Sequence, residues 1–186
     1  MSTRKTQGAY QTLIYNKGAL VLRMLHFLLS DPSNGDDKAF FEMMTDFVNR
    51  YRDQAASTDD FRRVANEHFA RSPIGRKYTL NNLDWFFLEW VHFADMPSYE
   101  FQYSLQDQPD GKVLLTGAVI QKHVPDNWFM ILPLVLSFGG NQEARGTVHA
   151  HGPSTPIQIK LPARPRKVML DPDHWIISES TSTKSN

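Results

Sequence analysis

The sequence contains no cysteine and no surplus of charge of either sign. Without cysteine, disulfides, thiolate metal sites and cysteine nucleophiles are excluded. Lysine and arginine together number 20, and so do aspartate and glutamate, so no basic excess attracts nucleic acid or anionic lipid over long range. The longest strongly apolar stretch, 128–138, is too short to span a membrane and contains Pro133. Arg4 and Lys5 do not lead into an apolar run, so no signal peptide is predicted.

The composition is that of a soluble globular protein, with 41% hydrophobic and 22% charged residues in a chain of 186. A chain of this length can form one large domain or two small ones, each with its own core. The hydrophobic pattern divides the chain in two, because apolar residues recur at helical spacing before Pro97 and at alternate positions after Tyr99.

The first half is predicted to be helical. Helices are expected over 13–29, around 40–48, after a cap at Ser57 or Thr58, and after a cap at Asn81 or Asn82. The second half is predicted to form six short strands separated by turn residues. The strands are expected over 100–105, 113–121, 128–138, 144–150, 157–161 and 167–170.

These patterns predict an α+β chain with a helical segment over 1–96 and a β-sandwich of the immunoglobulin-like type over 97–177. The last residues, 178–186, are almost entirely polar and are predicted to be a disordered tail.

Three segments resemble one peptidase family, in the family's order. Tyr15-Asn16-Lys17-Gly18 and the apolar helix after it resemble the Tyr-x-Lys-Gly helix of the aminopeptidase N and leukotriene hydrolase family of gluzincin zinc peptidases. The segment 57–61 resembles the family's capped Thr-x-x-Phe helix start, and 83–91 is similar to its Leu-x-x-Phe-Phe-x-x-Trp segment. Met96-Pro97 stands where the family has the Gly-x-Pro that leads into a β-sandwich domain. The resemblance covers roughly 8–172.

The resemblance implies that the helical segment is the end of a thermolysin-like catalytic domain and that the parent protein removes N-terminal residues from peptides. It implies that the Tyr15 phenol donates a hydrogen bond to the oxyanion of the transition state. The alternative for Tyr15 is a buried packing residue. Tyr10 stands where the family often has a second tyrosine, but five helical residues rotate by about 140°, so Tyr10 would have to lie before the helix or in its first turn.

The sequence departs from the family at the metal site. The family binds zinc through His-Glu-x-x-His and a later glutamate, and this sequence has neither that motif nor any two histidines spaced i, i+4. We therefore expect zinc in the parent protein but none bound by this chain, which would be inactive alone. The expected partner is the N-terminal half of the same polypeptide. Without it, exposed apolar helix faces and self-association are expected.

Other residues were weighed as candidates. Gly18 lies inside a predicted helix, which suggests that another backbone approaches it closely. His149 and His151 share a strand face but have no third ligand nearby. The aromatic residues within 85–90 lack the accompanying basic stripe of a nucleic-acid surface, so we expect them to be core.

Two hypotheses of other classes remain open. The chain could be a non-catalytic binding module that keeps the peptidase architecture. It could instead be a structural or adhesive β-sandwich with a helical cap, and in that case Tyr15 would be buried with its hydroxyl bonded internally.

Overall fold

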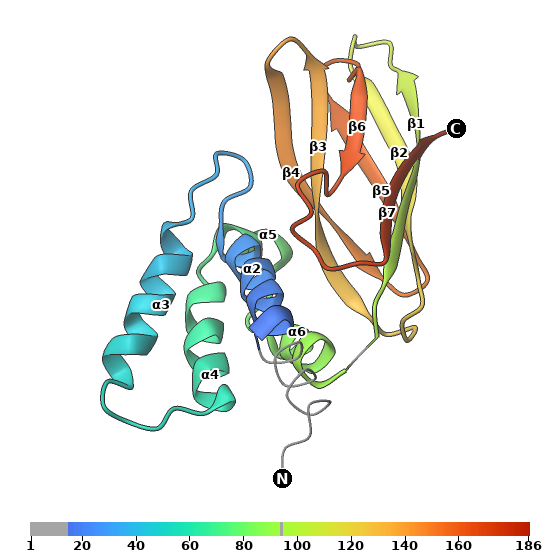
Figure 1. Cartoon of the computed structure of the whole chain (residues 1–186). Helices are drawn as coiled ribbons and strands as arrows, with labels where there is room; N and C mark the ends of the chain where they lie inside the picture. The colour runs from blue at the N-terminus through green and yellow to red at the C-terminus, as the bar shows by residue number, and fades with distance from the viewer. Residues whose placement is uncertain (1–14, 94) are drawn as a thin grey trace. The chain divides into compact units, whose positions relative to one another are not determined.

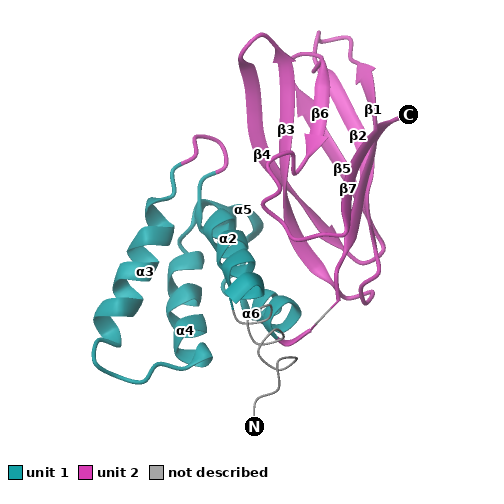
Figure 2. Ribbon diagram, viewed as in Figure 1, with its two compact units in different colours: residues 1–31, 36–91 teal, residues 32–35, 92–186 magenta. Residues whose placement is uncertain are grey.

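The structure is a computed structural model that describes residues 15–93 and 95–186. The chain divides into two compact units (Figure 2). Among the described residues, one unit is helical and contains 15–31 and 36–91, and the other contains 32–35 and the residues from 92 onward. A helical N-terminal part is therefore followed by sheets, as the α+β prediction requires. No helix in the described ranges is long and apolar enough to cross a membrane.

Five α-helices and one π-helix are described in the helical unit (Figure 1). They are α2 (Gly18–Leu29), α3 (Lys38–Arg50), α4 (Thr58–Phe69), α5 (Pro73–Tyr78), α6 (Asp84–Phe87) and the π-helix η2 (Leu88–His92). The backbone is also π-helical at 15–17, directly before α2. The first predicted helix therefore agrees with the structure over 15–29, and its residues 13 and 14 lie outside the described range.

The helix ends follow local side-chain chemistry. Ser57 and Asp60 form a capping box at the start of α4, in which each side chain accepts a hydrogen bond from the other residue's backbone N–H. The prediction of a cap at Ser57 is confirmed. The fourth predicted helix was expected to be capped by Asn81 or Asn82. This prediction is wrong by one or two positions, because the N-cap residue of α6 is Leu83. Asn82 still accepts a bond from the Asp84 N–H. Helix α5, capped by Ser72, was not predicted.

The core of the helical unit is apolar and aromatic. Its side chains that are at most 1% exposed include Met24, Leu25, Leu28, Leu29, Met43, Val64, Phe69, Ile74, Leu83 and Phe86. The aromatic segment 85–90 contributes Phe86, Phe87 and Trp90 to the buried residues. This segment was predicted to be core rather than a stacking surface, and the burial of these three side chains agrees with the prediction.

Seven strands form two sheets in the second unit (Figure 1). They are β1 (Ser98–Asp107), β2 (Val113–Lys122), β3 (Phe129–Gly139), β4 (Gln142–His151), β5 (Ser154–Leu161), β6 (Lys167–Leu170) and β7 (Ser180–Ser185). The four-stranded sheet has the order β5-β2-β1-β7, and the three-stranded sheet has the order β4-β3-β6. All six predicted strands are present. Strand β3 is buried over most of its length, as expected for the central strand of its sheet.

The prediction of a disordered C-terminal tail is wrong. Residues 180–185 form β7, which pairs with β1 in parallel from Ser98↔Ser180 to Tyr103↔Ser185. Polar composition suggested fraying because β7 has almost no apolar side chains to bury. The strand is instead held by backbone hydrogen bonds, which any residue other than proline can make.

Candidate functional site

Tyr15 lies at the start of the apolar helix and is exposed. Its side chain is 63% accessible, the largest exposure among the big hydrophobic residues described in the structure. Tyr15, Ala19 and Leu22 follow one another at spacings of four and three, so they share one face of the helix. All three are exposed. The π-helical turn at 15–17 therefore presents a phenol on its surface, and the N-terminal half of α2 continues it with aliphatic side chains.

Lys17 and Gly18 are the other two defining residues of the Tyr-x-Lys-Gly motif. Lys17 is partly buried. A Cβ added to Gly18 meets no atom within 4 Å in the described part of the chain. The close backbone approach predicted for this glycine is therefore not found there. Tyr10, the second candidate tyrosine, lies outside the described residues.

The C-terminal half of α2 is joined to the start of α3 through His26. The His26 Nε2 atom lies 3.1 Å from a carboxylate oxygen of Asp37. The imidazole ring stacks on Phe40 with a centroid distance of 4.4 Å and meets the edge of Phe41 at 5.7 Å. The two aromatic contacts and the contact with Asp37 hold the imidazole ring between α2 and α3. His26 therefore has a structural role.

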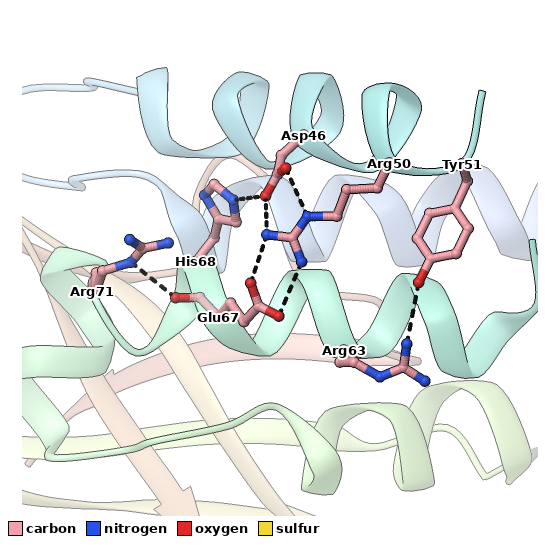
Figure 3. Close-up of polar contacts among 7 residues, drawn as sticks. All are labelled: Asp46, Arg50, Tyr51, Arg63, Glu67, His68 and Arg71. Carbon is pink, nitrogen blue, oxygen red and sulfur yellow. Dashed lines mark hydrogen bonds and ion pairs between the residues drawn. The ribbon is translucent and has the colours of Figure 1, made fainter.

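Helices α3 and α4 lie side by side and share a network of charged groups (Figure 3). Arg50 on α3 bonds bidentately to Asp46, at 2.8 and 2.7 Å, and to Glu67 on α4, at 3.1 and 2.7 Å. His68 adds a contact of 2.9 Å from its Nε2 atom to Asp46. The planar guanidinium of arginine suits two carboxylates at once. Sequence spacing reveals the Asp46–Arg50 pair, but only the packing of α3 on α4 brings in Glu67.

The pKa shifts in this network follow from hydrogen bonding. The bond from His68, followed by the bond from Arg50, lowers the pKa of Asp46. Arg50 likewise lowers the pKa of Glu67, and Glu67 and Asp46 together raise the pKa of Arg50. These shifts favour the charged forms of Asp46, Glu67 and Arg50, and each of the three has a partner. A network of this kind stabilises helix packing and offers no group poised for proton transfer.

No cluster in the described ranges combines three histidine, aspartate or glutamate side chains in a way that could hold a metal ion. His149 and His151 both contact the ring of Phe129, each with a centroid distance of 6.2 Å. The opposite residues on β3 are Ile131 and Phe129, so the neighbouring strand supplies no carboxylate to this pair. The structure thus places the two histidines on one face, as predicted, beside an aromatic ring.

A serine, a histidine and a glutamate meet where β1, β2 and β7 come together. The Nδ1 atom of His123 lies 2.6 Å from a carboxylate oxygen of Glu179 and 3.4 Å from the hydroxyl of Ser98. Ser98 also donates to the same carboxylate oxygen, at 3.2 Å. In a catalytic triad the acid and the nucleophile contact different ring nitrogens. Here both contact Nδ1, so the three residues do not form a charge-relay arrangement.

Asp171 is one of two buried acidic residues in the described ranges, and the other is Glu89. Asp171 is 2% exposed, and its two carboxylate oxygens accept backbone hydrogen bonds from Trp175 at 2.8 Å and Ile176 at 2.9 Å. Burial raises the pKa of Asp171, although the two bonds oppose this shift. Asp171 has a positive φ of 44°, a conformation that aspartate tolerates better than most residues. Through these two bonds the carboxylate organises the turn after β6.

No protein-family model matches the chain, and no curated protein matches it. The resemblance to zinc aminopeptidases therefore rests on the sequence motifs.

Proposed function

We propose that this chain is the tyrosine-bearing part of a zinc aminopeptidase that removes N-terminal residues from peptides, and that the chain is inactive by itself. The observation that carries the proposal is the exposure of the Tyr15 phenol, 63%, at the start of the helix that bears the Tyr-x-Lys-Gly motif. A tyrosine can stabilise an oxyanion only if substrate can reach its hydroxyl. The rival hypothesis of an adhesive sandwich needs Tyr15 to be buried, and this exposure opposes it.

The residues described here do not fit a zinc site. Each of their histidine–carboxylate contacts joins one histidine to one carboxylate: His26 to Asp37, His68 to Asp46, and His123 to Glu179. A zinc site in an enzyme needs three protein ligands. Under the proposal the zinc ligands come from a preceding part of the same polypeptide, and the contribution of this chain is the Tyr15 hydroxyl.

Exposed apolar side chains are evidence that the helical unit has a binding partner. Leu20 and Leu22 on α2 are 46% and 39% exposed, and Leu88 and Val91 on η2 are 49% and 38% exposed. Leucine and valine side chains exposed to this extent on both helices favour association. The proposed partner is the zinc-binding half of the polypeptide, and without it a second copy of the chain would cover these side chains.

The finer fold proposal is an immunoglobulin-like sandwich for the second unit. Its seven strands, divided four and three, match the number in the constant-type immunoglobulin domain. The antiparallel pairs β2–β5 and β3–β6 correspond to the B–E and C–F pairs of that domain. Two pairings differ from it, because β4 joins β3 and β7 joins β1. The proposal is thus an immunoglobulin-like variant with a displaced fourth and seventh strand.

The proposal is tested first by the reading frame and then by kinetics. A preceding His-Glu-x-x-His segment in the same frame is expected, and a stop codon directly before Met1 would favour the binding module instead. In the complete enzyme, Tyr15→Phe should lower kcat about 10²- to 10³-fold with little change in KM, the effect of losing one oxyanion donor. Tyr103→Phe, which removes a hydroxyl from the second unit, is the matched control and should leave kcat unchanged.

The chain alone gives a second, independent test. It should bind no stoichiometric zinc and should not hydrolyse an aminoacyl amide. Measurable turnover by the purified chain, or one zinc ion per chain, would show that the site has been assigned wrongly.

A further inference from the structure

The turn that joins α2 to α3 contains the Asn-Gly pair Asn34-Gly35 (Figure 1). Both residues are exposed, and Gly35 has a positive φ of 76°. A Cβ added to Gly35 would meet no atom within 4 Å among the described residues, so the space beside its Cα is open. Within the same ranges the Gly35 N–H donates no hydrogen bond. The amide nitrogen of Gly35 is therefore not held by another part of the fold.

An amide nitrogen in this position can attack the side-chain amide that precedes it. The Gly35 nitrogen loses its proton and forms a bond to Cγ of Asn34, while the Cγ–Nδ2 bond breaks and the nitrogen leaves as ammonia, which carries the proton away. The product is a succinimide ring. Water then opens the ring at either carbonyl and gives aspartate or isoaspartate, and no oxidant or reductant is required. Glycine favours the attack because it has no side chain to hinder its nitrogen.

The structure blocks the same reaction at Asp110-Gly111, the comparable pair in the turn between β1 and β2. The Gly111 N–H donates to Gln108 O at 3.0 Å, so its nitrogen is engaged. Ring closure at an aspartate also needs a protonated carboxyl group as the leaving partner. The bond from Lys160, followed by the bond from the Lys112 N–H, lowers the pKa of Asp110 and keeps its carboxylate charged.

Asn127 provides a second comparison, at an asparagine that is also exposed. The amide that follows it belongs to Trp128 and donates to Pro125 O at 2.9 Å. Attack on the Asn127 side chain would therefore require this hydrogen bond to break first. Exposure of the asparagine is shared by the two positions, whereas an unengaged following amide is found at Asn34.

We propose that Asn34 is a modification site, at which attack by the Gly35 nitrogen converts asparagine to aspartate and isoaspartate without an enzyme. Conversion adds a carboxylate to a segment that already contains Asp31, Asp36 and Asp37, and like charges repel. Isoaspartate also adds one main-chain carbon inside a turn that is closed by the bond from the Asp31 N–H to Asp36 O at 2.7 Å. The modification therefore loosens the connection between α2 and α3. This inference does not rest on the proposed peptidase function.

The test is incubation of the full chain in mildly alkaline buffer, which favours loss of the amide proton, followed by peptide mass mapping and enzymatic detection of isoaspartate. The Asn34 peptide should gain the mass of the acid about fivefold or more faster than the Asn127 peptide, the factor that one net hydrogen bond provides. Both products should form at Asn34, and no isoaspartate should form at Asp110. Conversion at Asn34 that is no faster than at Asn127 would overturn the proposal, as would aspartate formed without isoaspartate.

Variants test whether the Gly35 nitrogen is the attacking atom. Gly35→Asp introduces a residue that tolerates a positive φ and places a Cβ beside that nitrogen, so it should slow the conversion of Asn34 several-fold. Gly111→Asp is the matched control at the other positive-φ glycine, with φ 75°, and should leave the rate at Asn34 unchanged. Circular dichroism checks that both variants fold. An unchanged rate in folded Gly35→Asp would refute the mechanism, and if that variant does not fold, the comparison of Asn34 with Asn127 in the wild-type chain decides.

Discussion

Asp60 and Asp171 are two aspartates whose surroundings move their pKa in opposite directions. Hydrogen bonds from the backbone and side chain of Ser57 lower the pKa of Asp60 to about 2. Burial raises the pKa of Asp171 above its ordinary value of 3.8. The two directions follow from opposite balances: hydrogen bonds outweigh desolvation at Asp60, whereas burial outweighs the two backbone hydrogen bonds at Asp171.

Asp171 should be a residue on which the second unit depends. Asp171→Ala removes the acceptor of two buried or partly buried amides, and we expect it to lower the free energy of unfolding by about 1–3 kcal/mol. Urea denaturation followed by tryptophan fluorescence measures this change. Asp126→Ala, at an exposed loop position, should alter the free energy by no more than about 0.5 kcal/mol. Equal effects of the two substitutions would show that the Asp171 bonds do not stabilise the turn.

The pH dependence of Asp171 has the opposite sign to that of most acidic groups in proteins. Its raised pKa means that the folded protein binds the proton more tightly than the unfolded chain does. The ionisation of Asp171 therefore reduces stability as pH rises from 3.8 through the raised folded-state pKa.

At the scale of elements, α4 shows how a short sequence pattern determines a helix start. Ser57 accepts the Asp60 N–H at 3.2 Å, and Asp60 accepts the Ser57 N–H at 3.0 Å. Both donors would otherwise lack an intrahelical partner. Asp59 and Asp60 also place negative charge in the first turn, where the helix dipole favours it.

Ser57→Ala should lower the free energy of unfolding of the helical unit by about 1 kcal/mol, as expected when an N-cap hydroxyl is lost. The helical circular dichroism during urea denaturation reports this change. Thr58→Ala is the matched control, because Thr58 is the alternative cap in the sequence but lies inside α4, and its effect should be within about 0.5 kcal/mol.

The same substitution should change the acid response. Because the pKa of Asp60 is lowered, its bonds stabilise the folded chain above pH 3.8, and this contribution is lost as pH falls toward about 2. The largest cause of the shift is the Ser57 backbone N–H, which the substitution keeps, and the second is the Ser57 hydroxyl, which it removes. The difference in stability between wild type and Ser57→Ala should therefore shrink in part over that range. A difference that stays constant down to pH 2 would argue against the capping box.

At the scale of the whole molecule, the exposed apolar side chains of α2 should control association. We expect the chain to self-associate with increasing concentration, and Leu20→Ser together with Leu22→Ser to reduce this association. Sedimentation equilibrium measures the change. Phe41→Ser on α3 is the matched control, since Phe41 is 55% exposed but lies on another helix. A wild-type chain that stays monomeric at high concentration would contradict the expectation.

The sequence alone determined those features that depend on local pattern. The change from helical to alternating periodicity located the transition from helices to strands, and the Ser57 cap and the six strands follow from residues close together in the chain. The tyrosine motif likewise identified Tyr15 as a candidate, but sequence patterns could not say whether its side chain is exposed.

Only the tertiary structure decided which distant groups meet. The pairing of β7 with β1 depends on backbone groups that every residue carries, so the polar sequence at 180–185 gave no sign of a strand. The contacts of Arg50 with Glu67 and of His123 with Glu179 join residues 17 and 56 positions apart. Helix and sheet packing bring these side chains together, and the short-range periodicity of a sequence does not encode that packing.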